Sequence, residues 1–241
     1  MINVRKADEA TIVEFEHGAV NASDLEFLEA FVETLAGLEG PVVLTGAGRA
    51  FSAGVDLRRI VEDGDAYVEK FLARLSKALR ELFSYPAPTV AAINGHAIAG
   101  GCIFALCCDV RLMSGGTIGL AELPVGVAFP RVAMEVVRHS LGTAAQKAVL
   151  LGQAVGPDEA LRMGMVDEVV APEDLISRAL VRAAAMAHVP PSLYAMTKRD
   201  LHAPAMQAIA DRPDEALPVW TAPETKQRLT EYLESLASRK R

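Results

Sequence analysis

Apolar residues recur at helical spacing in some stretches of the chain and form short unbroken runs in others. Residues 24–38 carry Leu25, Leu28, Phe31 and Leu35 on one helical face, and Ser23 precedes them as the expected N-cap. Apolar stretches also predict helices over residues 67–83 and 101–108, whereas short runs predict strands over 10–15, 41–45, 88–93 and 110–113. We expect 10–15 to be an edge strand. Because strands and helices alternate, the predicted class is α/β.

Helical patterns dominate after about residue 130. They cover residues 133–139, 144–151, 157–163, 172–188, 192–201 and 224–237, with one short strand over 166–170 and an ambiguous, proline-rich stretch over 203–218. The last helix precedes Arg239, Lys240 and Arg241, a basic tail that is favourable at a helix C-terminus. We therefore predict an α/β core with the ligand site over residues 1–185 and a helical C-terminal region over 186–241.

The composition limits the function classes. Of 241 residues 51% are hydrophobic, which is enough for a buried core, and the net charge of −7 offers no basic surface, so we expect no nucleic-acid partner. The three cysteines Cys102, Cys107 and Cys108 match no zinc spacing and indicate buried, reduced thiols. The first nine residues lack the apolar segment of a secretory signal. These features favour a cytoplasmic protein.

One segment is long enough to span a membrane. Residues 82–108 contain no Asp, Glu, Lys or Arg. Pro86, Pro88 and the pair Gly100-Gly101 interrupt the segment, however, and a buried strand, a glycine loop and a buried helix explain it better. We therefore expect no membrane partner.

Glycines after the strand at 41–45 raise the possibility of a dinucleotide site. The run Gly46-Ala47-Gly48-Arg49-Ala50-Phe51 has phenylalanine where the fingerprint needs its third glycine, and the phosphate-loop lysine motif is absent. The sequence therefore disfavours nucleotide binding at this turn.

Two other segments each follow a buried strand and lead into a helix, over residues 49–57 and 92–101. Their small residues allow a ligand close to the main chain, and a free N–H at a helix start can stabilise an oxyanion. The alternative is that the glycines serve tight turns alone.

The amino-acid sequences of these two segments resemble those of the enoyl-CoA hydratase/isomerase (crotonase) family. Its two oxyanion segments are similar to Phe51-Ser52-Ala53-Gly54-Val55-Asp56-Leu57 and to Ile93-Asn94-Gly95-His96-Ala97-Ile98-Ala99-Gly100-Gly101-Cys102. Further matches, at Val20-Asn21-Ala22, at Cys108-Asp109-Val110-Arg111 and over residues 159–170, keep the family's order, so that the resemblance covers about residues 10 to 200.

The resemblance implies a crotonase-like spiral of ββα units with a helical C-terminal appendage, in a homotrimer or homohexamer. It implies an acyl-CoA substrate, of which coenzyme A is a part, and neither a metal nor a separate cofactor. Carried over by position, the oxyanion donors are the N–H groups of Ala53 and Gly100. The resemblance also implies a set of substrate-binding residues, namely Ser52, Gly54, Val55, Asp56, Leu57, Ile103 and Phe129.

The carboxylates distinguish the activities within this family. Hydratases typically hold one water with two glutamates, but here the first position is Ile103 and only Glu122, in Gly119-Leu120-Ala121-Glu122-Leu123-Pro124-Val125-Gly126, matches the second. Apolar neighbours should raise the pKa of Glu122, as suits a proton-transfer group. A paired structural carboxylate is the alternative reading of Glu122.

One carboxylate suffices for a 1,3-proton shift, so the pattern favours a Δ3,Δ2-enoyl-CoA isomerase that converts 3-enoyl-CoA to 2-enoyl-CoA. A hydratase and a non-catalytic acyl-CoA-binding homologue remain alternatives. Lys198 either reaches a CoA phosphate or is simply solvated.

Overall fold

Six strands form the larger sheet of the computed structural model, which describes residues 1–238. Their order is β1 (Ile2–Ala7), β2 (Ala10–Phe15), β3 (Val42–Gly46), β5 (Thr89–Ile93), β7 (Val110–Met113) and β9 (Glu168–Val169). Only the β1–β2 pair is antiparallel. The central strands β3 and β5 are fully buried, as their apolar runs predict.

A smaller parallel sheet lies beside the first. It contains β4 (Ala50–Ser52), β6 (His96–Ile98) and β8 (Ile118–Gly119). Along the chain β3 is followed by β4, β5 by β6 and β7 by β8, and each pair leads into a helix. Three successive turns therefore add one strand to each sheet, which confirms the predicted spiral of ββα units.

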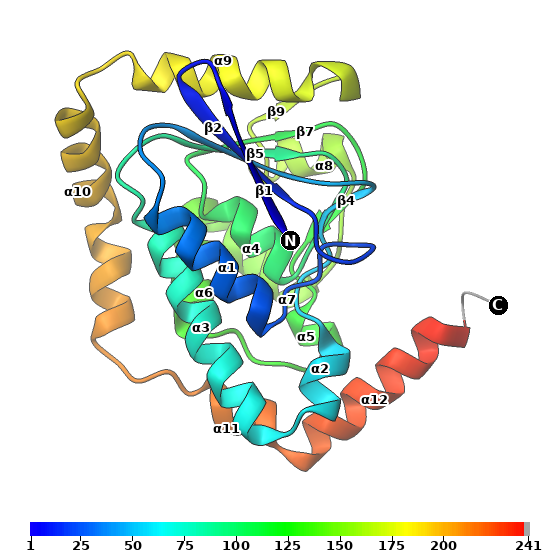
Figure 1. Ribbon diagram of the computed structural model, residues 1–241. Coiled ribbons are helices and arrows are strands. Elements are labelled where there is room, and N and C mark those ends of the chain that lie inside the picture. The colour runs from blue at the N-terminus through cyan, green and yellow to red at the C-terminus, as the bar shows by residue number, and fades with distance from the viewer. Residues whose placement is uncertain (239–241) are drawn as a thin grey trace.

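Helices cover both faces of the larger sheet (Figure 1). One face packs on α9, while the other faces the main core with α1, α3 and α4. The helices are α1 (Leu25–Ala36), α2 (Leu57–Glu62), α3 (Asp65–Phe83), α4 (Gly100–Leu106), α5 (Glu122–Val125), α6 (Arg131–Leu141), α7 (Ala145–Leu151), α8 (Pro157–Arg162), α9 (Leu175–Ala187), α10 (Pro191–Ala210), α11 (Ala216–Thr221) and α12 (Pro223–Ser238), with short 3-10 turns at Gly142–Ala144 and Pro172–Asp174.

The N-terminal strand corrects one prediction. Residues 10–15 were expected at the sheet edge, but β1 pairs along the whole of β2 and takes that edge. The pattern of β1 gave little signal because its middle residues Val4, Arg5 and Lys6 are all exposed. A polar, half-solvated strand is typical of a protected sheet edge.

The cap of α1 corrects another prediction. Asp24, not Ser23, is the N-cap, because an Asp24 carboxylate oxygen accepts the Phe27 N–H at 2.8 Å. The Ser23 backbone instead pairs with the first glycine segment, donating to the Gly54 carbonyl at 2.6 Å and accepting the Asp56 N–H at 2.9 Å. Long-range pairing therefore fixes Ser23 before the helix begins.

The C-terminal region is helical, and the ambiguous stretch resolves into two helices. α10 continues through Pro204 because Ala205 and Ile209 are buried in the main core, and α11 follows after a short turn. The predicted boundary after residue 185 falls in the last turn of α9. The basic tail at 239–241 lies outside the described residues. No helix within residues 1–238 is long and apolar enough to cross a membrane.

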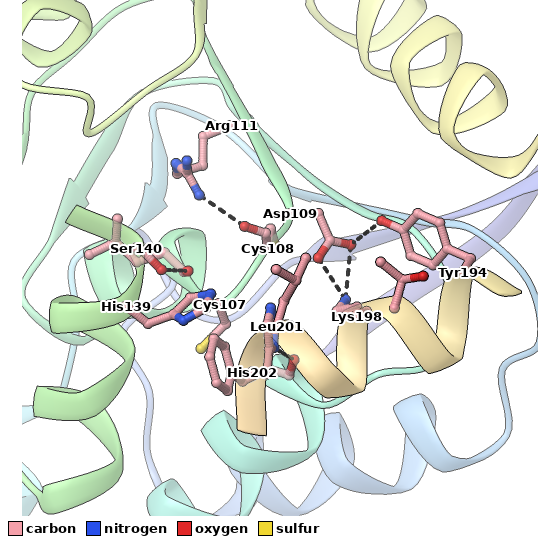
Figure 2. A pocket seen from close by; sticks show the side chains of 13 residues that line it. Cys107, Cys108, Asp109, Arg111, His139, Ser140, Tyr194, Lys198, Leu201 and His202 are labelled. Atoms are coloured by element: carbon pink, nitrogen blue, oxygen red, sulfur yellow. Dashed lines mark hydrogen bonds and ion pairs between the residues drawn. The ribbon is translucent and has the colours of Figure 1, made fainter. Parts of the chain in front are cut away.

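A buried ion pair joins α10 to the larger sheet. It involves Lys198, which was predicted either to reach a CoA phosphate or to be solvated. Its ammonium lies 2.8 Å from one carboxylate oxygen of Asp109, and the other oxygen accepts the Tyr194 hydroxyl (Figure 2). That second oxygen also accepts the Thr89 N–H. Lys198 is 5% exposed. It is therefore neither solvated nor in the lining of the cavity described below, and we assign it a structural role.

Candidate active site

A cavity of about 650 Å³ opens between the two glycine segments. Its wall includes seven of the ten predicted site residues, which are Ala53, Val55, Asp56, Leu57, Gly100, Ile103 and Glu122. Three predicted residues, Ser52, Gly54 and Phe129, lie outside the lining. The fold thus brings the carboxylate and both glycine segments to one apolar chamber of the size that small-molecule sites usually have.

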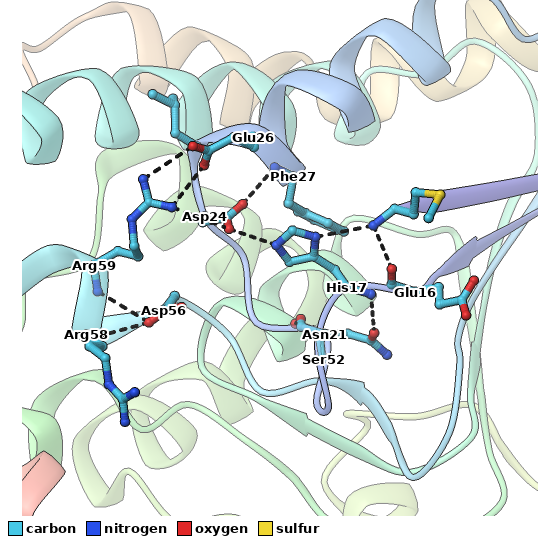
Figure 3. Close-up of polar contacts among 12 residues, drawn as sticks. Glu16, His17, Asn21, Asp24, Glu26, Phe27, Ser52, Asp56, Arg58 and Arg59 are labelled. Atoms are coloured by element: carbon cyan, nitrogen blue, oxygen red, sulfur yellow. Dashed lines mark hydrogen bonds and ion pairs between the residues drawn. The ribbon is translucent and has the colours of Figure 1, made fainter. Parts of the chain in front are cut away.

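Buried polar contacts brace the first segment from behind. The Ser52 hydroxyl donates to the Asn21 carbonyl at 2.7 Å and accepts the Gly54 N–H at 3.1 Å. The Asn21 side chain in turn accepts the His17 N–H (Figure 3). It also donates to the carbonyls of Ala47 and Ala50. Ser52 therefore supports the segment instead of lining the cavity.

The hydrogen bonds correct the choice of donor in this segment. The Ala53 N–H donates to the Val20 carbonyl at 2.9 Å, so it is not available to a ligand. The Val55 N–H, two residues on, has no acceptor within residues 1–238, and Val55 lines the cavity. Motif position alone could not separate these two amides, because the Val20 loop that occupies Ala53 is distant in sequence.

The N–H of Gly100, which the resemblance implies as the second donor, lies at the start of a helix. Gly100 is the first residue of α4, so its N–H has no carbonyl to pair with inside the helix. Gly54 allows the two segments to approach: a Cβ there would lie 2.7 Å from the Ile98 carbonyl oxygen and 3.1 Å from Gly100 N. Any side chain on Gly54 would force apart the segments that carry Val55 and Gly100.

Glu122 begins α5 and projects from a buried position. It is 5% exposed, and its Oε2 has no hydrogen-bond partner within residues 1–238. Burial raises the pKa of Glu122 to about 8, in the direction that the apolar neighbours predict. Leu120, Val125 and Val127 are buried beside it, although Leu123 turns out to solvent. The unpartnered Oε2 distinguishes Glu122 from a structural carboxylate that is paired at both oxygens.

Of the other charged groups of the cavity, one is hydrogen-bonded to a helix end and one is exposed. Among residues 1–238, Asp56 is the only other acidic residue in the lining, and its carboxylate caps α2 by accepting the N–H groups of Arg58 and Arg59 (Figure 3). Ile103 contributes an apolar surface from α4. Arg58 is exposed at the cavity and is a cation that the sequence analysis did not single out.

The C-terminal helices complete the wall. Trp220 of α11 lines the cavity and donates its indole N–H to the Ala128 carbonyl at 2.8 Å. Tyr232, Leu233 and Leu236 of α12 line it as well. The predicted contact Phe129 is half-buried against the main core, while its neighbour Pro130 faces the cavity. The amphipathic pattern over 224–237 was the available signal for this wall.

The sequence from residue 8 to residue 237 matches the family described as enoyl-CoA hydratase/isomerase. The chain belongs to this enzyme family. Its acyl-CoA chemistry fits a cavity with two free N–H groups and one buried carboxylate.

Relatives of both activities are similar to this family member. Rat mitochondrial enoyl-CoA delta isomerase 1 is 35% identical over 72% of this chain, but the match spans only 64% of the rat protein. A putative enoyl-CoA hydratase from Thermus thermophilus is 32% identical over 82% of both chains. The crystal structure of human mitochondrial Δ3-Δ2-enoyl-CoA isomerase superposes with a TM-score of 0.94 at 28% identity, covering 100% of this chain and 99% of the human one.

Proposed function

We propose that this protein is an enoyl-CoA isomerase that moves the double bond of a 3-enoyl-CoA to the 2-position. The observation that carries the proposal is the carboxylate of Glu122: within residues 1–238 its Oε2 has no hydrogen-bond partner, whereas the carboxylate of Asp56 caps a helix. Ile103 occupies the position where typical hydratases have the first of their two glutamates. The likeness to the two mitochondrial isomerases supports the same choice.

The cavity supplies what a 1,3-proton shift needs. The Glu122 carboxylate removes a proton from C2 of the substrate, and the electron pair moves onto the thioester oxygen to give a dienolate. The N–H groups of Val55 and Gly100 stabilise that oxygen, and one such donor is typically worth about 3–4 kcal/mol. The Glu122 acid then returns the proton at C4, which completes the 2-enoyl-CoA.

The proposal requires no cofactor beyond the coenzyme A that the substrate carries. The exposed guanidinium of Arg58 is suited to attract the CoA phosphates at the cavity mouth. We further propose the cytoplasm as the place of action, because Cys102, Cys107 and Cys108 are buried free thiols that suit a reducing compartment.

A substrate panel tests the activity. We expect isomerisation of a 3-enoyl-CoA to exceed hydration of a 2-enoyl-CoA of the same length at least tenfold, a barrier difference of about 1.4 kcal/mol. Hydration that equals or exceeds isomerisation would favour the hydratase, a candidate that the Thermus relative supports. Tight acyl-CoA binding without either turnover would instead indicate a non-catalytic binding protein.

A further inference from the structure

Ala99 has a backbone conformation that residues with a side chain rarely adopt. Its φ is 50° and its ψ is −119°. Two other non-glycine residues within 1–238 have positive φ, Asp8 and Asn21, and both belong to the residue types that tolerate it best. Alanine has no polar side chain to compensate, so the surrounding structure must hold Ala99 in place.

Two backbone hydrogen bonds keep Ala99 in this conformation. The Ala99 N–H donates to the Gly119 carbonyl at 2.8 Å, which ties it to β8. The Ala99 carbonyl accepts the Ile103 N–H at 3.0 Å, which ties it to the first turn of α4. Since both sides of the residue are fixed, the orientation of the Ala99–Gly100 peptide is fixed too. The N–H of that peptide belongs to Gly100.

The Ala99 side chain also takes part. A Cβ built on Gly54 would lie 3.3 Å from the Ala99 Cβ, so the alanine methyl group packs beside the Gly54 backbone. Ala99 lines the cavity next to Gly100. The methyl group therefore sits where the Val55 segment and the Gly100 segment approach each other.

We propose that Ala99 is a positioning residue of the oxyanion hole, which aims the Gly100 N–H and fixes its spacing from the Val55 segment. This inference rests on the proposed function, since it needs a substrate oxygen between the two donors. Fixed donors stabilise developing charge without reorganising during the reaction. Glycine would accept the same φ but also many others, so the peptide would lose part of its orientation.

The test is Ala99→Gly, a variant that can fold because glycine adopts this conformation without strain. Losing an oxyanion donor outright typically costs 100- to 1000-fold in kcat, so loosening one should lower kcat about tenfold. KM should change less than twofold, because the substitution removes only one methyl group from the cavity wall. Asp8→Gly is the matched control: it also replaces a positive-φ residue, in the exposed turn between β1 and β2, and should keep wild-type kcat.

Infrared spectroscopy of a bound 2-enoyl-CoA, labelled with ¹³C at the thioester carbonyl, gives a second readout. We expect binding to wild type and to Asp8→Gly to lower the carbonyl frequency, and Ala99→Gly to bring the band back toward the free ligand and broaden it. If the kcat of Ala99→Gly and the carbonyl band of its complex both match those of the wild type, the positioning role is overturned. A wild-type complex with no carbonyl shift would instead overturn the proposed oxyanion hole itself.

Discussion

At the scale of single residues, burial raises the pKa of Glu122, which suits the proposed proton transfer and costs the fold stability when the carboxylate is charged. A carboxylate whose pKa lies near 8 holds its proton in the free protein at neutral pH, because the apolar cavity disfavours the charge. The same group is a stronger base once it is ionised. Both consequences can be measured on one substitution.

Glu122→Gln keeps the size of the side chain and removes the base. Acid–base catalysis is typically worth 100- to 10,000-fold, so turnover should fall at least 100-fold while acyl-CoA binding changes little. A folded variant that binds acyl-CoA and retains more than a tenth of wild-type turnover, a loss of only ~1.4 kcal/mol, would falsify the assignment.

Stability gives an independent check on the same variant. Because the folded-state pKa of Glu122 is raised, the wild type loses stability as pH rises from the ordinary glutamate range to about 8. Glu122→Gln should therefore melt higher than wild type at pH 9 and close to it at pH 4.5. A structural carboxylate predicts the reverse, a lower melting temperature at pH 9 with a modest kinetic loss.

The pH dependence of kcat/KM follows from the same pKa. Since the base must be ionised in the free enzyme, kcat/KM should rise about tenfold per pH unit below 8 and level off above it. Steady-state rates between pH 6 and 9.5 provide the measurement. A flat profile through this range would show that another group removes the proton.

A substitution at Ile103 tests the expected preference for isomerisation over hydration of the substrate. Its side chain is 2% exposed in α4 and lines the same cavity as Glu122. Ile103→Glu should raise hydration of 2-enoyl-CoA, because a second carboxylate can help to hold and deprotonate a water. Leu57→Gln, a polar change elsewhere in the lining that adds no carboxylate, is the control and should give no such gain.

At the scale of secondary-structure elements, long-range pairing decides where α1 begins. Asp24→Ala removes the carboxylate that caps α1 and also contacts His17, so the free energy of unfolding should fall by about 1–2 kcal/mol. Ser23→Ala is the matched control. Its hydroxyl has no hydrogen-bond partner within residues 1–238, so this change should be nearly neutral. Urea unfolding of both variants tests the difference, and equal losses would contradict the observed cap.

Other elements show which sequence patterns predict secondary structure well. The buried strands β3 and β5 and the helices α1 and α3 stand close to their predicted ranges, because an apolar face or run must be covered. The two- and three-residue strands of the smaller sheet are too short for a periodic signal, and only pairing between successive spiral turns defines them. α10 runs through Pro204 for a related reason, since its packing outweighs the local preference of one proline.

At the scale of the whole molecule, the helical region leaves apolar side chains uncovered. Leu150 and Leu151 on α7 are 63% and 52% exposed, and Leu201 on α10 is 65% exposed. Association would cover such surface, so we expect a homotrimer or a homohexamer. Sedimentation at micromolar concentration should give three or six times the chain mass. A stable monomer there would contradict this expectation.

The sequence by itself determined the α/β class, because the alternation of strands and helices is a local pattern. Its motifs also determined the family resemblance, which implies the spiral, the two glycine segments and a role for Glu122, because each motif consists of residues close together in the chain. Tertiary structure alone decided which amides are free. The Val20 carbonyl, more than thirty residues before Ala53, accepts that N–H, whereas the Val55 N–H has no acceptor within residues 1–238. It also decided that Asp109 neutralises Lys198 and that α12 closes the cavity. A hydrogen-bonding group can bind only a few partners, and the fold of the whole chain decides which partners lie within bonding distance.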